Sequence, residues 1–187
     1  GMNTANPLDG ARKPGTVGPP LPGVECLVVN DANDPLPAGE TGHLWVRGPN
    51  VFQGYWQNAA KTAESFTTDN FFKTGDLAVI DEDGYVSIVG RSKDLIITGG
   101  LNVYPKEIEL VLDAINGVME SAVIGLPHPD FGESVCAVIV SLPEVDLTPE
   151  FIFDQIKTRL ANFKTPKKIF FLQNLPRNTM GKVQKNQ

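Results

Sequence analysis

The chain has 187 residues, of which 41% are hydrophobic and 20% are charged, and its formal net charge is −6. This length suits one ordinary domain or two small ones, and the composition fits a soluble globular protein. No apolar run approaches the roughly eighteen residues that a membrane helix needs, and the negative charge argues against a nonspecific nucleic-acid binder. We therefore expect no membrane span and no nucleic-acid partner.

The cysteines and histidines show no pattern typical of a metal site or of a nucleophile. Cys26 and Cys136 lie in apolar, strand-like runs without metal-ligand spacing, which favours reduced, buried thiols and a cytoplasmic location, and excludes a disulfide framework. His43 and His128 have no Ser or Cys nucleophile motif beside them, so we interpret His128 as a structural loop residue. We expect no metal site formed by this chain's own side chains.

The charge is distributed unevenly along the chain. Residues 156–187 hold eight Lys or Arg and no Asp or Glu, whereas the preceding residues sum to −14. A cationic surface on an anionic protein suits a small polyanion such as a nucleotide or coenzyme. The alternative is a solvated basic face.

The first ninety residues read as short strands between turns. We expect strands at 24–29, 43–47, 77–80 and 85–89, forming an antiparallel sheet or a small barrel. The acidic loop Asp81–Gly84 ends in a glycine, which suits a hairpin joining the last two strands. Such a hairpin would bring Asp76 and Arg91 to the same end.

After Arg91 the pattern changes to mixed helix and strand. Pro105 suits the first position of a helix that buries a stripe at 108, 111, 112 and 115 and ends at Asn116-Gly117. A second helix begins at Thr148, and strands are expected at 120–124, 134–140 and 168–172. The fold class predicted is α+β: a β-rich antiparallel subdomain over 1–92, followed by a small α+β domain over 93–187.

Three segments carry more than fold information: Lys73-Thr74-Gly75-Asp76-Leu77, the run from Gly90 to Glu109, and Leu175-Pro176-Arg177-Asn178-Thr179-Met180-Gly181-Lys182. Together, in this order and spacing, they resemble the C-terminal third of the adenylate-forming acyl-CoA synthetases. The resemblance covers nearly the whole chain. Its opening and closing residues look most like the malonyl-CoA synthetase branch of that family.

The resemblance implies an acid-thiol ligase that uses ATP, coenzyme A and a small carboxylic acid, such as malonate. Residues 1–92 would end a large N-terminal domain, and 93–187 would be a mobile C-terminal domain truncated at its end. Mg²⁺ would accompany ATP, held mainly by the phosphates and by residues upstream. The chain alone would be inactive, because the upstream domain carries the phosphate loop and the acid pocket. Two alternatives are an adenylation domain that loads a carrier protein and a non-catalytic nucleotide- or CoA-binding module.

Asp76, Ile88 and Arg91 are the candidate nucleotide ligands. An ionised carboxylate can accept hydrogen bonds from both ribose hydroxyls of a nucleotide. The resemblance gives Asp76 and Arg91 this role and makes Ile88 an apolar contact near the nucleotide. The alternative is an Asp–Arg salt bridge that closes a hairpin.

Lys182 and Lys93 are the candidates for catalysis and for domain motion. By the resemblance, Lys182 bridges the carboxylate oxygen of the acid and the α-phosphate, where negative charge builds during adenylation. Lys93 would be the hinge about which the small domain rotates between the two half-reactions. The alternatives are a surface lysine near a ragged end and an ordinary linker lysine.

Gly99, Gly100, Phe163 and Lys167 are the candidates for binding coenzyme A. The two glycines suit a hairpin turn, and the resemblance places them beside the pantetheine arm, where the absence of a side chain admits a slim thiol. Phe163 would stack on adenine, and Lys167 would meet phosphate. Thr165 stands where some members of the family carry arginine, which weakens this part of the resemblance.

Overall fold

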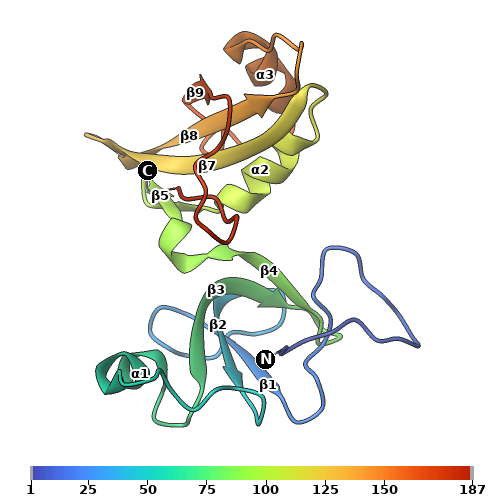
Figure 1. The fold of residues 1–187 in the computed structure, drawn as a ribbon, viewed down its shortest axis with the longest axis vertical. Helices are drawn as coiled ribbons and strands as arrows, with labels where there is room; N and C mark the ends of the chain where they lie inside the picture. Colours follow the sequence, from blue (N-terminus) through green and yellow to red (C-terminus); the bar gives the residue numbers. More distant parts are fainter. Residues whose placement is uncertain (1, 186–187) are drawn as a thin grey trace. The chain divides into compact units, whose positions relative to one another are not determined.

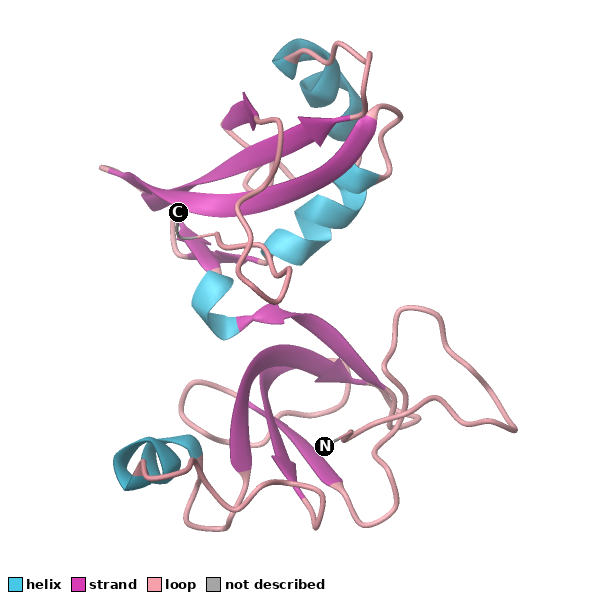
Figure 2. Cartoon of the chain, viewed as in Figure 1, coloured by secondary structure: helices cyan, strands magenta, loops and turns pink. Residues whose placement is uncertain are grey.

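The structure is a computed structural model that describes residues 2–185, and the chain divides into two compact units between Lys93 and Asp94 (Figure 1). The first unit is mostly strands and loops, whereas the second combines helices with a sheet (Figure 2). This confirms the α+β class. None of the described helices is both long and apolar enough to cross a membrane.

The first unit is built on an antiparallel sheet in the order β1-β2-β3-β4. Its strands are β1 (Glu25–Val29), β2 (Thr41–Arg47), β3 (Phe72–Ile80) and β4 (Val86–Arg91). Residues of β2 alternate between partly exposed and buried, as its sequence predicts, and Leu44 and Val46 join Val28, Ala78 and Val86 in the core. Within the described residues β1 does not pair with β4, so the structure is a sheet and not a closed barrel.

Two features of this unit differ from the expected elements. The strand expected from Leu77 begins at Phe72, because Phe72 pairs with Val46 of β2. A short helix, α1 (Ala59–Ser65), follows Asn58, whose side chain accepts a hydrogen bond from the Lys61 amide.

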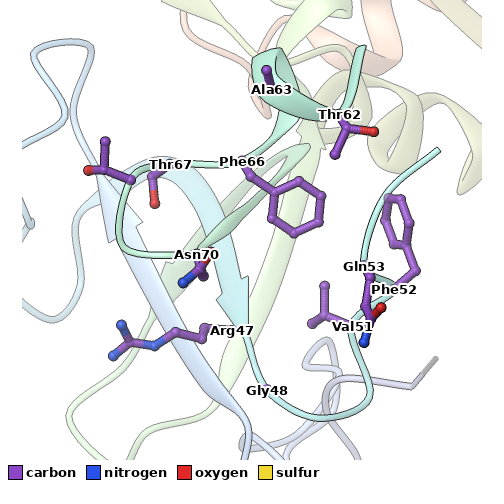
Figure 3. Close-up of a pocket in the computed structure, with 11 residues that line it drawn as sticks. Arg47, Gly48, Val51, Phe52, Gln53, Thr62, Ala63, Phe66, Thr67 and Asn70 are labelled. Atoms are coloured by element: carbon purple, nitrogen blue, oxygen red, sulfur yellow. The ribbon is translucent and has the colours of Figure 1, made fainter. Parts of the chain in front are cut away.

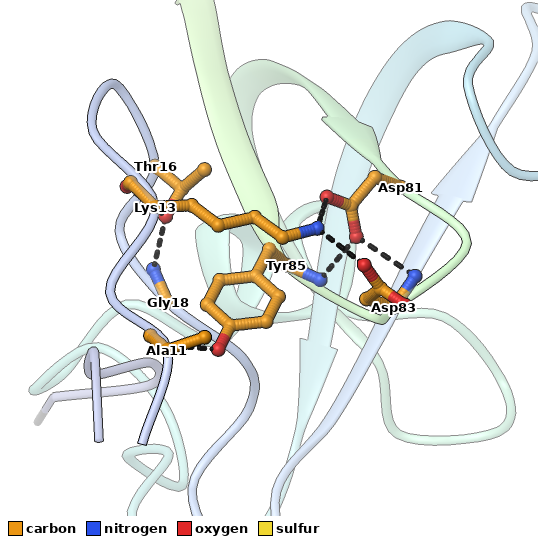
Figure 4. A network of polar contacts seen from close by, with 7 residues as sticks. All are labelled: Ala11, Lys13, Thr16, Gly18, Asp81, Asp83 and Tyr85. Carbon is orange, nitrogen blue, oxygen red and sulfur yellow. Dashed lines mark hydrogen bonds and ion pairs between the residues drawn. The ribbon is translucent and has the colours of Figure 1, made fainter. Parts of the chain in front are cut away.

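The β3–β4 hairpin is fastened at its loop to the N-terminal segment (Figure 4). Lys13 Nζ lies 2.5 Å from Asp81 Oδ2 and 2.6 Å from Asp83 Oδ2, and 4.6 Å from the centre of the Tyr85 ring. The Tyr85 hydroxyl donates to the carbonyl of Ala11 at 2.5 Å. The hydrogen bond from Lys13 is the main reason that the pKa of Asp81 is lowered. The N-terminal loop is thus tied to the hairpin by charge as well as by packing.

The second unit is a five-stranded sheet with helices on one face. Its elements are β5 (Ile96–Thr98), β6 (Leu101–Val103), α2 (Pro105–Asp113), β7 (Val118–His128), β8 (Gly132–Ser141), α3 (Pro149–Ile156) and β9 (Lys168–Phe171). β8 pairs with β7 antiparallel and with β9 parallel, and it meets β5 at Gly132. Ile108 and Leu112 of α2 and Ile152 and Ile156 of α3 are fully buried in one core. Burial of these positions is as predicted, but α2 ends at Asp113, so Ile115 is buried beyond the end of the helix and not on it.

The segment after β9 returns across the opposite face of this sheet. Ala122 and Val140 point away from the helices, because successive strand residues alternate between faces, and the buried Leu175 packs on them. Val183 packs partly on the same cluster. These apolar contacts place the last described residues on the sheet.

Both cysteines are free and they belong to different units. Cys136 is buried, as expected, whereas Cys26 is only half-buried. Burial raises the pKa of both thiols, that of Cys26 to about 11. Both are therefore poor nucleophiles at neutral pH.

Candidate active site

The β3–β4 hairpin holds the candidate nucleotide ligands. Arg91 lies opposite Asp76 in the strand register, and its Nε is 3.1 Å from Asp76 Oδ1. Arg91 Nη1 also donates to the carbonyl of Thr74 at 3.2 Å. Ile88, opposite Ala78 on the same hairpin, is 39% exposed. The ion pair expected as the alternative is present, and it fixes a carboxylate that is 25% exposed beside a guanidinium.

Lys93 lies in a short 3₁₀ turn, η1 (Ser92–Asp94), between β4 and β5. Its side chain is exposed, and the two compact units divide directly after it. The residue therefore lies in the short connection where the two units divide, the kind of position that can absorb a backbone change.

Gly99 and Gly100 form the two-residue turn between β5 and β6. Both have positive φ, +56° and +78°, which a glycine adopts without strain, and the expected hairpin is confirmed. The Gly99 amide donates to the Phe131 carbonyl at 2.9 Å, and a Cβ at Gly99 would lie 3.4 Å from the Phe131 ring. A Cβ added at Gly100 would have no atom within 4 Å.

Phe163 lies in a different environment from these glycines. Its ring is 37% exposed, and the neighbouring Lys164 sits 5.7 Å from the ring centre while pairing with Glu107, in the first turn of α2, at 2.7 Å. Lys167 donates to the carbonyl of Asn162 at 3.2 Å. The two halves of the expected coenzyme site thus contact different elements within the described residues, and Lys164 is the lysine nearest the aromatic ring.

Lys182 lies on a tight turn whose backbone is organised by Asn178. The Asn178 side-chain oxygen accepts hydrogen bonds from the amides of Met180 and Lys182, both at 3.0 Å. The Asn178 amide donates to the Lys182 carbonyl at 2.9 Å. The backbones of Arg177 and Val183 form an isolated antiparallel β-bridge. The Lys182 side chain is exposed, and its ammonium has no ion-pair or hydrogen-bond partner within residues 2–185.

Two stretches of the chain match models of a single enzyme family. Residues 1–56 match the AMP-binding enzyme family, and residues 107–182 match the AMP-binding enzyme C-terminal domain. The chain belongs to the AMP-binding enzymes. Lys182 is the last residue of the second matched range, whereas Asp76 and Arg91 lie between the two matched ranges.

The relatives of this chain include several acyl-CoA ligases. The chain is 41% identical to malonate–CoA ligase of Arabidopsis thaliana, covering 100% of this chain and 32% of that one. It is 40% identical to a long-chain-fatty-acid–CoA ligase of Yersinia pestis, covering 96% of this chain and 32% of that one. The crystal structure of ATP-bound MatB from Rhodopseudomonas palustris matches with a TM-score of 0.93 and 56% identity, over 98% of this chain and 37% of that one. The chain thus spans about a third of the length of the curated relatives it matches.

Part of the positive charge of the basic tail, residues 156–185, is neutralised by ion pairs. Four of its eight cationic residues form ion pairs with acidic residues: Lys157, Lys164, Arg177 and Lys185. The other four, Arg159, Lys167, Lys168 and Lys182, form no ion pair within residues 2–185, so the tail keeps about half of its positive charge unpaired. The exposed Lys182 ammonium is one of these four unpaired cations.

A pocket of about 640 Å³ in the first unit was not predicted (Figure 3). Val51, Phe52 and Phe66 give it an apolar wall, and Arg47 and Asn70 give it a polar one. The Arg47 guanidinium is already engaged by Glu25 at 2.6 Å and by the Phe71 ring at 4.2 Å. The concentration of aromatic residues between 52 and 72 was the signal in the sequence. None of the candidate site residues lines this pocket.

The two histidines and the acidic side chains were the other groups considered for a catalytic or metal site. His43 pairs with Asp31 at 2.9 Å, and the ring of His128 lies 4.9 Å from that of Phe131. Within residues 2–185 no group of three or more His, Cys, Asp or Glu side chains is arranged to hold a metal ion. The described side chains therefore do not fit a magnesium site of their own.

Proposed function

We propose that this chain is the C-terminal part of an ATP-dependent carboxylate–CoA ligase that makes an acyl-CoA through an acyl-adenylate. The observation that carries the proposal is the exposed Lys182 ammonium on a turn whose backbone is fixed by Asn178. A cation on a restrained backbone, with no partner among residues 2–185, suits a reaction in which negative charge develops on the substrate. The CoA ligases among the relatives support coenzyme A as the acceptor, in place of a carrier protein.

In the first step proposed, a carboxylate oxygen of the acid attacks the α-phosphorus of ATP. A phosphorus–oxygen bond forms, and the bond to the leaving pyrophosphate breaks. The Lys182 ammonium would lie beside the attacking oxygen and the α-phosphate and lower the barrier by countering their charge. Asp76 and Arg91 would hold the ribose, and Ile88 would contact the nucleotide.

In the second step, the coenzyme A sulfur attacks the acyl carbon and AMP leaves with the bonding electrons of the carbon–oxygen bond, while the thiol proton is lost. We propose that the pantetheine arm passes Gly99 and Gly100, with Phe163 and Lys167 near the coenzyme's nucleotide. Lys93 would be the pivot between the two steps, because the compact units divide there.

We propose that Mg²⁺ accompanies ATP and is held by its phosphates and by groups outside this chain. Because the described side chains offer it no site, we assign it no step here. The phosphate loop and the acid pocket also belong to the upstream domain in this proposal. The 187 residues alone are therefore expected to show no turnover.

Malonate is the acid we propose. The closing segment of the chain and the 41% identity to malonate–CoA ligase support it. A long-chain-fatty-acid–CoA ligase is 40% identical, so overall identity in this part of the protein does not select the acid. The choice of acid must then be tested directly.

The test is an assay of the full-length enzyme with ATP, coenzyme A and a panel containing malonate, methylmalonate, acetate and palmitate. Formation of malonyl-CoA, AMP and pyrophosphate is the expected result. Activity with palmitate alone would overturn the choice of malonate but keep the ligase. Formation of ADP, or acyl transfer that needs no coenzyme A, would overturn the proposed ligase reaction itself.

A further inference from the structure

The turn that carries Lys182 is held on both sides by ion pairs to distant parts of its unit. Arg177, five residues before Lys182, pairs with Glu120 of β7. Lys185, three residues after it, pairs with Glu109 of α2. The partners lie 57 and 76 residues away along the chain, so these contacts arise from the tertiary fold.

The pair on the C-terminal side involves a buried carboxylate. Glu109 is only 7% exposed, and its Oε1 accepts a hydrogen bond from the Val123 amide of β7 at 2.9 Å. A buried charge is costly unless it is paired and hydrogen-bonded, and Lys185 provides the opposite charge. Glu109 therefore holds Lys185 at a defined point, unlike the mobile ion pairs of an open surface.

The pair on the N-terminal side reaches the backbone beside Lys182 itself. Arg177 Nη1 donates to the Gly181 carbonyl at 2.7 Å, while Nη2 pairs with Glu120. One rigid guanidinium thus links β7 to the residue that precedes Lys182. The backbone of the turn is restrained from both sides, while the Lys182 side chain remains exposed.

We propose that Glu120–Arg177 and Glu109–Lys185 are positioning pairs that determine where the Lys182 ammonium is delivered during adenylation. None of the four residues needs to touch substrate in this role. The inference rests on the proposed function of Lys182. A misplacement of about 1 Å can cost roughly 100-fold in rate, so loss of one restraint should appear in the adenylation step.

The experiment uses Lys185→Met in the full-length enzyme. We expect pyrophosphate exchange to slow by about 10- to 100-fold, with the KM for ATP little changed, because nucleotide contacts remain while the lysine is misplaced. Thioester formation from supplied acyl-adenylate should stay within about twofold, since Lys182 serves the first step. Lys185→Arg, which preserves the charge, should restore most of the exchange rate. Lys157→Met is the matched control, because it breaks an exposed lysine pair with Asp154 far along the chain from the turn.

A second variant is needed because Lys185→Met leaves the buried Glu109 carboxylate without its opposite charge, which could lower the stability of the fold. Glu109→Gln combined with Lys185→Met removes both charges and keeps an acceptor for the Val123 amide. We expect this double variant to melt near the parent and still to lose adenylation selectively. Equal losses in both half-reactions, or full adenylation activity in the folded double variant, would overturn the proposal.

Lys182→Ala separates this inference from the proposed function. In a Lys182→Ala background, Lys185→Met should cause no further loss of adenylation, because nothing remains to be positioned. A further multiplicative loss there would overturn the positioning role. If Lys182→Ala alone leaves adenylation intact, the proposed function fails and the positioning role fails with it. If Lys182→Ala abolishes adenylation but Lys185→Met does not affect it, only the positioning role fails.

Discussion

Arg91 lies directly opposite Asp76 in the β3–β4 pair, with its Nε 3.1 Å from Asp76 Oδ1. The pair is partly exposed, and an exposed ion pair contributes at most about 1 kcal/mol to stability. The same guanidinium also orients the carboxylate that we propose as a ribose ligand. A role in closing the hairpin predicts that mutation lowers stability, whereas a role in binding the nucleotide predicts that mutation lowers affinity for AMP.

Asp76→Asn in the full-length enzyme should weaken AMP binding by about 10- to 100-fold, because hydrogen bonds to a charged group contribute about 1.5–3 kcal/mol. Its melting temperature should change by only about 2 °C, as expected for a surface pair. Isothermal titration and a thermal melt measure the two effects. Glu25→Gln is the control, because it breaks another cross-strand pair of the same sheet, with Arg47, and should leave AMP affinity unchanged. If Asp76→Asn binds AMP as tightly as the parent, Asp76 has no role in nucleotide binding and only pairs with Arg91 in the hairpin.

Lys182→Ala should lower the adenylation rate by about 100-fold or more, the usual cost of removing a placed charge-stabilising group. Conversion of supplied acyl-adenylate to acyl-CoA should be nearly unaffected, because the bond between the carboxylate oxygen and the α-phosphorus, whose formation Lys182 is proposed to assist, is already present in that substrate. Pyrophosphate exchange and single-turnover thioester formation separate the steps. Lys168→Ala, which removes another exposed cation of the tail, is expected to alter neither. A comparable loss in both steps would contradict the role assigned to Lys182.

Gly100→Ala should slow thioester formation by about tenfold and leave adenylation within about twofold, because its methyl group would narrow the path proposed for the pantetheine arm. Its φ is +78°, and no atom lies within 4 Å of the added carbon, so the structural cost is backbone strain of about 1 kcal/mol. Gly84→Ala, at φ +81° with the same open surroundings, gives the control for that strain. If both variants affect the two half-reactions alike, Gly100 has no part in the coenzyme path.

Lys13→Met should loosen the N-terminal loop from the β3–β4 hairpin, because Lys13 joins Asp81 and Asp83 (Figure 4). Hydrogen exchange should accelerate at Val17, whose amide donates to Val86, relative to the parent at pH 7. Lys13 lowers the pKa of Asp81, so the stabilisation is present above the unfolded value near pH 4 and is lost as the pH falls through the folded value. The difference between parent and variant should therefore shrink below about pH 4. An equal difference at pH 7 and in acid would exclude the ion pair as its cause.

Much of the fold was predictable because its signals are local. Alternation in β2 and the Asp81–Gly84 loop predicted the strand faces and the hairpin, and hence the meeting of Asp76 and Arg91. The seven residues of α1 are too few to show an apolar stripe, and only Ser65 among them is buried, so this helix left no signal in the pattern. The early start of β3 at Phe72 depends on pairing with Val46, a contact that only the assembled sheet provides.

The sequence by itself determined the strand and helix periods, the hairpin turns and the excess of positive charge in the tail, because each depends on neighbours within a few residues. Only the tertiary structure decided which of those charges are neutralised. Arg177 and Lys185 meet Glu120 and Glu109 because the tail packs Leu175 back on the sheet, across separations of 57 and 76 residues. The sequence does not indicate which acidic residue each of these cations will pair with, because it is the packing of the core that brings the two charges together.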